Sequence, residues 1–372
     1  MTNNQLMIKV YTNFSEGEKW LDNYQNKMPI FACILGFTNT ALIPGISTAG
    51  AKPEDRKYTA IADGEFLING VTDKPKFPLP PLDKGISPVF ISRGVIEAFN
   101  IPVYLFNAGL PHPPSVKNID LQGIPAKCVS TGNAMPLSIV KHLFQQGLNW
   151  GKKLGEKAKE ENRYLILGEC VVGGTTTALS LLSGLGIDAK GKVNSSHPNC
   201  NHQQKWQIVE EGLKKAELLP LKKNFNPLEI VAKVGDPMQV VVAGMALNAS
   251  KYTGVTLAGG TQMLAVYALI KSLSSQFNHG DYPIIVGTTR WIAEDTTGDT
   301  VGLAKTIPDT CLIATQLDFS KSNYHQLRIY EEGYVKEGVG AGGLAIASSL
   351  AANWNSDDLI NAIEKLILAT IK

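Results

Sequence analysis

The chain has 372 residues, 44% of them hydrophobic and 18% charged, which is enough for a packed core in one large domain or two ordinary ones. Its formal net charge is +2, and we find no basic run and no Lys/Arg stripe interleaved with aromatic residues, so nucleic acid is not an expected partner. No apolar run approaches the ~20 residues that a membrane helix needs, so no membrane association is expected.

The cysteine usage and the N-terminus favour a cytoplasmic protein. The five cysteines are scattered and form no CxxC pair, as expected for reduced thiols inside the cell. The first residues, MTNNQ, lack a basic stretch followed by an apolar one, so we predict no signal peptide. The cysteines are Cys33, Cys128, Cys170, Cys200 and Cys311.

Short apolar segments alternate with helical patterns along the chain. Strands are predicted at 28–37, 102–106, 163–167, 254–257 and 283–286, and helices at 134–158, 206–216, 239–250, 262–273 and 357–371. This order predicts an α/β fold: a mostly parallel, Rossmann-like sheet flanked by helices, with a smaller helical part from the chain termini. Ligands of such sheets sit at the carboxyl ends of the strands, so several loops are expected to converge on one site.

The domain organisation rests on one ambiguous segment. Residues 74–88 carry five prolines and are either an ordered crossing loop or a linker. Because no internal repeat or composition shift marks a boundary, we expect a single large domain covering 1–372.

The stretch 168–177, GECVVGGTTT, lies between a predicted strand and a predicted helix. Free N–H groups and the helix dipole favour a phosphate at such a turn, and Gly173 and Gly174 let the backbone approach a ligand. The hydroxyl groups of residues 175–177 add donors. Glu169 would repel a phosphate unless it has a function such as holding a ribose hydroxyl group. The alternative is a structural turn that binds nothing.

A second glycine-rich stretch contains Glu337, with four glycines in the six residues that follow it, before a predicted helix at 344–347. A partly desolvated carboxylate there is a candidate general base. The alternative is a charge that complements the helix dipole. The turn 258–262 (AGGTQ) follows a predicted strand and is a candidate phosphate or ribose contact. Asp236, with Pro237 after it, is interpreted as the cap of the helix that follows.

Two other patterns are interpreted as structural. Residues 186–192 match the spacing of a phosphate-binding P-loop up to its lysine, but Val193 replaces the hydroxyl residue and a helix precedes the segment. His197, Cys200 and His202 have metal-ligand chemistry without an evident fourth partner, and an irregular loop is favoured over zinc.

Taken in order, these motifs resemble those of nicotinate-nucleotide–dimethylbenzimidazole phosphoribosyltransferase, the enzyme that makes the α-ribazole phosphate of cobamides. Its family motifs read close to GEMGIGNTTTA and LGEGTGA, and this chain has GECVVGGTTTA at 168–178 and VKEGVGAGG at 335–343. The resemblance is closest over 165–347. The N-terminal half is more similar to the divergent archaeal and cyanobacterial branch of this superfamily.

The resemblance implies roles for individual residues. The catalytic base of the family falls on Glu337, its second acidic residue on Glu169, and its phosphate-facing lysine on Lys205. Glu337 would take a proton from one nitrogen of a benzimidazole while the other nitrogen attacks C1′ of nicotinate mononucleotide and nicotinate leaves. The implied substrate-binding set is Gly173, Gly174, Thr175, Thr176, Lys205, Gly259, Gly260, Thr289, Gly338 and Gly340.

The same resemblance implies a nucleotide and a heteroaromatic base as the small-molecule partners, a homodimer, and no metal or cofactor. The chain departs from the family pattern at 287–291 (GTTRW), at Ala258–Gly259 and in the loop 194–202. These departures leave the acceptor base open. A nucleotide-binding protein without turnover and a transferase of the same fold with another base remain alternatives, and the retention of Glu337 favours an enzyme.

Overall fold

One eight-stranded sheet organises the computed structural model, which describes residues 7–50, 52–80, 85–220, 226–274, 276–277 and 280–371. The strand order is β1-β8-β7-β6-β5-β2-β3-β4, and every pairing is parallel except that between β1 and β8. The strands are β1 (Ile8–Val10), β2 (Pro29–Leu35), β3 (Val103–Asn107), β4 (Ile119–Asp120), β5 (Tyr164–Cys170), β6 (Val255–Ala258), β7 (Ile284–Thr289) and β8 (Leu312–Thr315).

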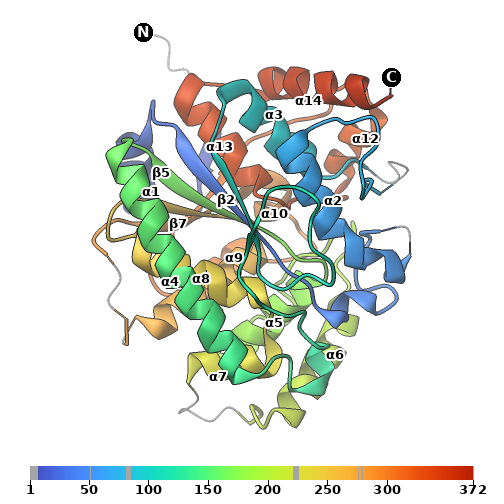
Figure 1. The fold of residues 1–372 in the computed structure, drawn as a ribbon, viewed down its shortest axis with the longest axis vertical. Helices are drawn as coiled ribbons and strands as arrows, with labels where there is room; N and C mark the ends of the chain where they lie inside the picture. The colour runs from blue at the N-terminus through green and yellow to red at the C-terminus, as the bar shows by residue number, and fades with distance from the viewer. Residues whose placement is uncertain are drawn as a thin grey trace.

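Helices cover both faces of this sheet (Figure 1). They are α1 (Phe14–Tyr24), α2 (Arg56–Asn69), α3 (Val89–Phe99), α4 (Leu137–Glu160), α5 (Gly174–Gly184), α6 (His202–Lys215), α7 (Pro227–Val234), α8 (Pro237–Ala249), α9 (Thr261–Leu273), α10 (Arg290–Ala293), α11 (Thr300–Thr306), α12 (His325–Arg328), α13 (Ala341–Ala352) and α14 (Ser356–Ile371). None of the helices in the described part of the chain combines the length and the hydropathy that crossing a membrane requires.

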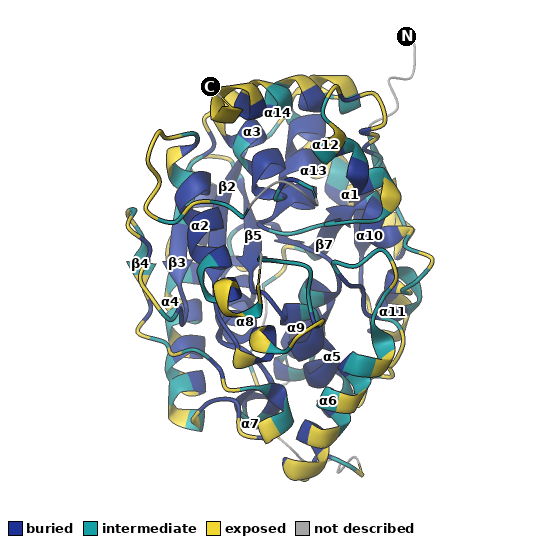
Figure 2. Ribbon diagram, turned by 90° about the vertical axis from the view of Figure 1, so that its right-hand side faces the viewer, coloured by how far each residue is buried: buried dark blue, intermediate teal, exposed yellow. Residues whose placement is uncertain are grey.

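The two faces hold two separate hydrophobic cores. Along β2, Ile30, Ala32 and Ile34 belong to the core under α4, α5, α8 and α9, whereas Phe31 and Cys33 belong to the core under α1, α2, α3, α13 and α14. This alternation follows from the two-residue period of a strand. Both faces are buried, so the central strands have continuous apolar runs; they lie in the dark-blue interior of Figure 2. The predicted α/β class and mostly parallel sheet are confirmed.

The packing of terminal elements also agrees with the predicted helical part. Helices α13 and α14 near the C-terminus pack against α3 from the N-terminal third, and the three lie together at the top of Figure 1. Strand β1 pairs with β8 at the edge of the sheet, with Ile8 opposite Thr315. The two ends of the chain therefore complete one side of the molecule.

The register of the sheet brings the carboxyl ends of the central strands together. Leu35 at the end of β2 pairs with Cys170 at the end of β5, and Ala258 at the end of β6 pairs with Gly168 and Gly287. The loops that follow these strands therefore leave the sheet at one edge, where ligands of parallel sheets bind.

Helix α4 packs closely on α8 because glycines line its contact face at four-residue spacing. A Cβ on Gly147 would lie 2.4 Å from the carbonyl oxygen of Val241, and one on Gly151 would lie 2.3 Å from that of Met245. Residues four apart lie on the same face of a helix, so the pair forms one smooth stripe.

We expect Gly151→Ala to lower the free energy of unfolding by about 1–3 kcal/mol, because the added methyl group meets backbone atoms that cannot rotate away. The control is Gly94→Ala in α3, where the Cβ would meet Ala362 at an ordinary 3.6 Å. That change should raise stability by about 0.4–1 kcal/mol through the unfolded state. Urea unfolding of both variants checks the pair, and equal midpoints would contradict this packing.

Candidate active site

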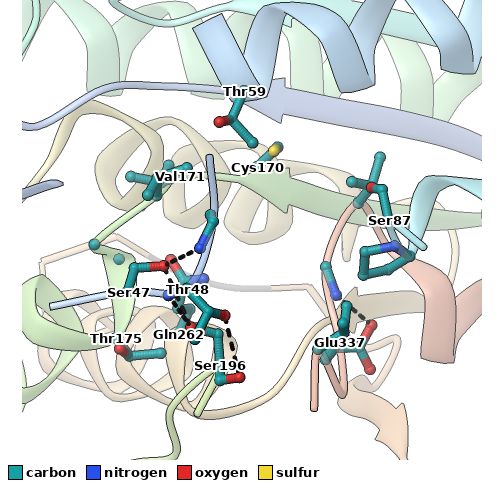
Figure 3. Close-up of a pocket in the computed structure, with 18 of the residues that line it drawn as sticks. Ser47, Thr48, Thr59, Ser87, Cys170, Val171, Thr175, Ser196, Gln262 and Glu337 are labelled. Atoms are coloured by element: carbon teal, nitrogen blue, oxygen red, sulfur yellow. Dashed lines mark hydrogen bonds between the residues drawn. The ribbon is translucent and has the colours of Figure 1, made fainter. Parts of the chain in front are cut away.

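A cavity of about 420 Å³ opens at the carboxyl edge of the sheet. Its walls come from segments far apart in the sequence: the loop 46–50, helix α2, residues 85–88, the turn 169–175, residues 194–196, residues 260–262 and the loop 335–339. Figure 3 shows Glu337 and Ser87 on one side of this cavity, and Ser47, Thr175, Ser196 and Gln262 on the other.

The turn between β5 and α5 forms the wall beside Thr175. Gly173 has φ of 80°, a left-handed conformation that is strained for residues with a Cβ, and it precedes the first residue of α5. The N–H groups in the first turn of a helix have no partners within the helix, and the helix dipole adds positive potential at that end. Here the N–H groups of Gly174 and Thr176 donate to the backbone oxygens of Val171 and Gly173, both at 3.0 Å, so the turn offers the cavity the N–H of Thr175 and the positive end of the helix dipole.

Four donors hold the carboxylate of Glu337 at the opposite side. The hydroxyl group of Thr288 and the backbone N–H of Thr289 donate to Oε2, both at 2.9 Å. The N–H groups of Gly338 and Gly342 donate to Oε1 at 3.1 and 3.0 Å. Burial raises the pKa of Glu337, while these hydrogen bonds oppose that rise. The carboxylate is thus oriented and partly desolvated, and because its roughly four lone-pair positions are occupied, one of these donors must give way when Glu337 accepts a proton.

The loop that carries Glu337 has strained backbone. Val335, Lys336 and Val339 have φ angles of 64°, 67° and 54°, a region that residues with a Cβ rarely adopt. For a β-branched residue such a conformation costs of the order of 1–3 kcal/mol and persists only where surrounding contacts impose it. Strain of this kind clusters at functional sites, which agrees with a role for this loop in positioning Glu337.

This C-terminal loop is fixed directly to the end of β5. The N–H of Val339 donates to the backbone oxygen of Glu169 at 2.9 Å. Beside this bond the two chains pass closely, since a Cβ on Gly168 would lie 3.1 Å from the Cα of Gly340 and 2.7 Å from the ring of Phe31. Glycines at both positions therefore allow the two acidic residues of the site to face one cavity.

Glu169 is only 3% exposed, and its environment keeps it neutral. Burial, followed by the charges of Asp236 and Glu337, raises the pKa of its carboxyl group to about 8. Nε2 of Gln262 donates to Oε1 at 2.9 Å and the N–H of Val171 donates to Oε2 at 3.1 Å. The site thus combines an oriented base, Glu337, with a second carboxyl group that is protonated at neutral pH.

We expect the free energy of unfolding to depend on pH through the protonation of Glu169. The pKa of Glu169 is about 8 in the folded state against an ordinary 4.5, so between these values the folded state binds the extra proton. The group's contribution to the free energy of unfolding is complete below pH 4.5 and falls by about 1.4 kcal/mol per pH unit as pH rises toward 8. Urea unfolding of the wild type and of Glu169→Gln from pH 5 to 8 tests this. The difference between them should shrink with pH, and parallel curves would contradict it.

Beneath the loop 194–196 lies a layer of buried charge. Lys336 pairs with Asp295 at 2.6 Å, with 1% and 5% of their side chains exposed. Lys205 is fully buried and donates to the backbone oxygen of Asn194, and burial lowers its pKa to about 8. Lys205 therefore reaches the back of the cavity wall and not the cavity itself, because the loop 194–196 covers it.

Two loops cover the side of the cavity near α5. The N–H of Thr48 donates to Oγ of Ser196 at 3.0 Å, and Oγ of Ser196 lies 3.3 Å from that of Ser47. The guanidinium group of Arg56, 5% exposed, donates to backbone oxygens of 41, 43, 47 and 49 and so fixes the first loop. These hydroxyl groups were not predicted, although 45–50 (GISTAG) has the small and polar composition of a ligand-contacting turn.

The predicted residues divide into two groups. Glu169, Gly173, Gly174, Thr175, Gly260, Glu337 and Gly338 line the cavity. Thr289 lies behind it and donates to Glu337 and to the backbone oxygen of Lys336. Thr176, Lys205, Gly259 and Gly340 also lie outside its lining. Their direct contact with a substrate is not supported by this geometry.

The two histidines of the loop 194–202 form hydrogen bonds with backbone oxygens. Nε2 of His197 lies 3.0 Å from the backbone oxygen of Gly45, and Nε2 of His202 lies 2.6 Å from that of Thr297. Within the described ranges, no group of three or more His, Cys, Asp or Glu residues is arranged to hold a metal ion. The loop 194–202 thus anchors the wall of the cavity.

Comparison with known sequences gives a family match and close relatives. Residues 98–282 match a family model described as phosphoribosyltransferase. A UPF0284 protein of Crocosphaera subtropica is 65% identical over 97% of this chain and 98% of its own length, and one of Rippkaea orientalis is 62% identical over 98% and 99%.

Solved structures support the fold. A structure of CobT from Thermus thermophilus superposes with a TM-score of 0.56 at 17% identity, covering 90% of this chain and 84% of that one. A second, described as nicotinate-nucleotide–dimethylbenzimidazole phosphoribosyltransferase from the same organism, has a TM-score of 0.54 at 17% identity and covers 92% and 84%. The matches confirm the resemblance inferred from the sequence motifs.

Proposed function

The chain belongs to the UPF0284 family, and from this premise we propose that it is a phosphoribosyltransferase that moves the phosphoribosyl group of nicotinate mononucleotide to a benzimidazole-type base. The observation that carries the proposal is the shared cavity of Glu337 and the turn before α5. Gly174 and Glu337, 163 positions apart in the chain, both line this cavity of about 420 Å³, on opposite sides of it. The match of residues 98–282 to the phosphoribosyltransferase family supports the reaction class.

The end of the cavity near α5 would bind the 5′-phosphate. The first turn of α5 supplies the N–H of Thr175 and the positive end of the helix dipole. Ser47, Thr48 and Ser196 line the same side. The hydroxyl group of Thr48 donates to the backbone oxygen of Ser196 at 3.3 Å, and one of the paired hydroxyl groups of Ser47 and Ser196 is left to donate to a phosphate. Lys205 adds a positive charge behind the wall, since a pKa of about 8 leaves it mostly protonated at neutral pH. Its role is then electrostatic, without direct contact with the phosphate.

The transfer step follows from the position of Glu337. Its carboxylate accepts the proton from one ring nitrogen of the acceptor base, and the other ring nitrogen forms a bond to C1′ of the ribose. The bond from C1′ to the nicotinate nitrogen breaks, and its electron pair stays on that nitrogen. Holding both reactants in one cavity supplies the effective concentration that makes such a step fast.

Glu169 would act as a neutral hydrogen-bonding group. A protonated carboxyl group both donates and accepts, which suits a ribose hydroxyl group. Its charged form would instead repel the phosphate and Glu337. Buried oxygens nearby also lack partners among the described residues, namely Oγ1 of Thr261 and Oε1 of Gln262, and both residues line the cavity. Such atoms are expected to bind a ligand, because an unpaired buried polar group is costly.

The test is an assay of nicotinate release. The purified chain is incubated with nicotinate mononucleotide and a panel of benzimidazoles, purines and phenols, and nicotinate is followed by chromatography. Release that depends on a base, with a matching base riboside phosphate as product, supports the proposal. If the protein binds nicotinate mononucleotide but releases no nicotinate with any base of the panel, a binding protein that lacks turnover is supported instead. We also propose that the chain forms a homodimer. Light scattering coupled to size-exclusion chromatography measures the molar mass that tests this.

A further inference from the structure

The geometry points to Asp63, with Thr59, as the group that selects the acceptor base, favouring a heteroaromatic base with an exocyclic amino or hydroxyl group over one with methyl groups. This inference rests on the function proposed above and names its substrate class. Asp63 and Thr59 lie four residues apart on α2, therefore on the same face of the helix, and both line the cavity. Neither has a part in the transfer step.

Contacts of Asp63 connect it to the Glu337 side of the cavity, where the proposed function places the base. Oγ of Ser87 donates to its Oδ1 at 2.6 Å, and Ser87 is on the same side of the cavity as Glu337 in Figure 3. Pro88 packs on Gly338, since a Cβ there would lie 3.5 Å from Cγ of Pro88. Sγ of Cys170, the residue after Glu169, donates to Oδ2 at 3.4 Å. Asp63 is thus linked to the neighbours of both acidic residues of the site.

The carboxyl group of Asp63 has acceptor capacity left over. It is 4% exposed and receives one hydroxyl and one thiol donor, whereas a carboxylate offers about four lone-pair positions. Among the described residues it takes part in none of the ion pairs, and burial raises its pKa to about 6. A buried charge with so few partners is costly, and a donor on a ligand would offset that cost.

Thr59 supplies an independent observation. Its side chain is 9% exposed, and Oγ1 is buried without a partner among the described residues. The hydroxyl group of Thr59, one helical turn from Asp63, can accept or donate a hydrogen bond. A base edge with a donor for the carboxylate of Asp63 and an adjacent acceptor for the hydroxyl group of Thr59 therefore matches the two side chains. Methyl groups at this position would leave the carboxylate and the hydroxyl group unpaired.

The experiment compares two donor-bearing bases, adenine and 5-hydroxybenzimidazole, with 5,6-dimethylbenzimidazole. For each base it measures kcat/KM for nicotinate release and the equilibrium binding affinity by calorimetry. We expect the wild type to prefer the two donor-bearing bases. Asp63→Asn should reduce this preference roughly 10- to 100-fold, the factor that corresponds to a lost hydrogen bond to a charged group. Thr59→Val, which retains the acid, should reduce it by a smaller factor.

Glu65→Gln is the matched control. Glu65 is a second acid of α2, also 4% exposed, but it accepts from Ser115 at 2.6 Å and lies outside the cavity lining. The ratio between bases should not change in this variant. If the wild type prefers dimethylbenzimidazole, or if Asp63→Asn and Thr59→Val both retain the wild-type ratio, the inference is wrong. Calorimetry separates this inference from the proposed transfer function. If the bases bind with a selectivity that depends on Asp63 but no nicotinate is released, the transfer function is contradicted and the role of Asp63 in base selection is not.

Discussion

Replacing Glu337 by glutamine is expected to lower kcat for nicotinate release by roughly 10²- to 10⁴-fold, the usual contribution of a positioned general base. The amide cannot accept the proton of the base, and its NH₂ group would face two of the donors that now hold the carboxylate. The nucleotide should still bind, because its phosphate site lies on the other side of the cavity. Steady-state kinetics and calorimetry with nicotinate mononucleotide measure the two effects separately.

Glu332→Gln provides the control for this variant. Glu332 is an exposed acid five residues earlier in the same segment, so its loss changes the net charge equally without touching the cavity. Its kinetics should match those of the wild type. Wild-type turnover in Glu337→Gln would remove the carboxylate from the mechanism, and loss of nucleotide binding would show that its role is structural.

Gly174→Ala is expected to raise KM for nicotinate mononucleotide on the order of 10- to 100-fold, since displacements of about 1 Å in a positioning group have effects of this size. A Cβ on Gly174 would lie 1.6 Å from Oε1 and 2.5 Å from Cδ of Gln262. Gln262 must therefore move, and its hydrogen bond to Glu169 is lost with it. The added methyl group would also narrow the approach to the first turn of α5.

Stability separates this effect from misfolding. The contact is with the end of a flexible side chain, and alanine is a better helix former than glycine, so the melting temperature should stay near that of the wild type. Gly94→Ala, whose Cβ meets only ordinary contacts, should change neither KM nor kcat. Unchanged affinity in Gly174→Ala would mean that the nucleotide does not bind against this turn.

Local signals made the central part of the fold predictable. Strands β2 and β5 are buried on both faces and therefore have the continuous apolar runs that marked them in the sequence. The cap at Asp236 is confirmed as a full capping box with Gln239, because both partners lie within one turn. The edge strands β1 and β4, of three and two residues, were missed because so few residues carry little periodicity, and β8 was missed as well.

Helix α2 was missed although it is long, because most of its surface is buried. Ten of its residues are buried, so it lacks the one-sided apolar pattern by which amphipathic helices are recognised. Asp63 was missed with it. Of the proline-rich segment 74–88, residues 81–84 lie outside the described residues, and residues 85–88 form part of the cavity wall.

The sequence predicted the motifs of the site better than their environment. The turn 173–175 and Glu337 could be recognised because each is a compact motif beside a helix start. The pairing of Ser196 with Thr48 joins residues 148 positions apart, and the burial of Lys205 depends on the loop that covers it. Such long-range contacts leave no local pattern, so a lysine expected to face the phosphate lies behind the wall.

A crystal structure with nicotinate mononucleotide, without an acceptor base, tests the central claim most directly. We expect the phosphate on the first turn of α5, between Gly174 and the hydroxyl groups of Ser47 and Ser196. The ribose should lie beside Glu169 and Gln262, with C1′ facing the side of Glu337. A nucleotide bound elsewhere, or bound with its phosphate toward Glu337, would contradict the account.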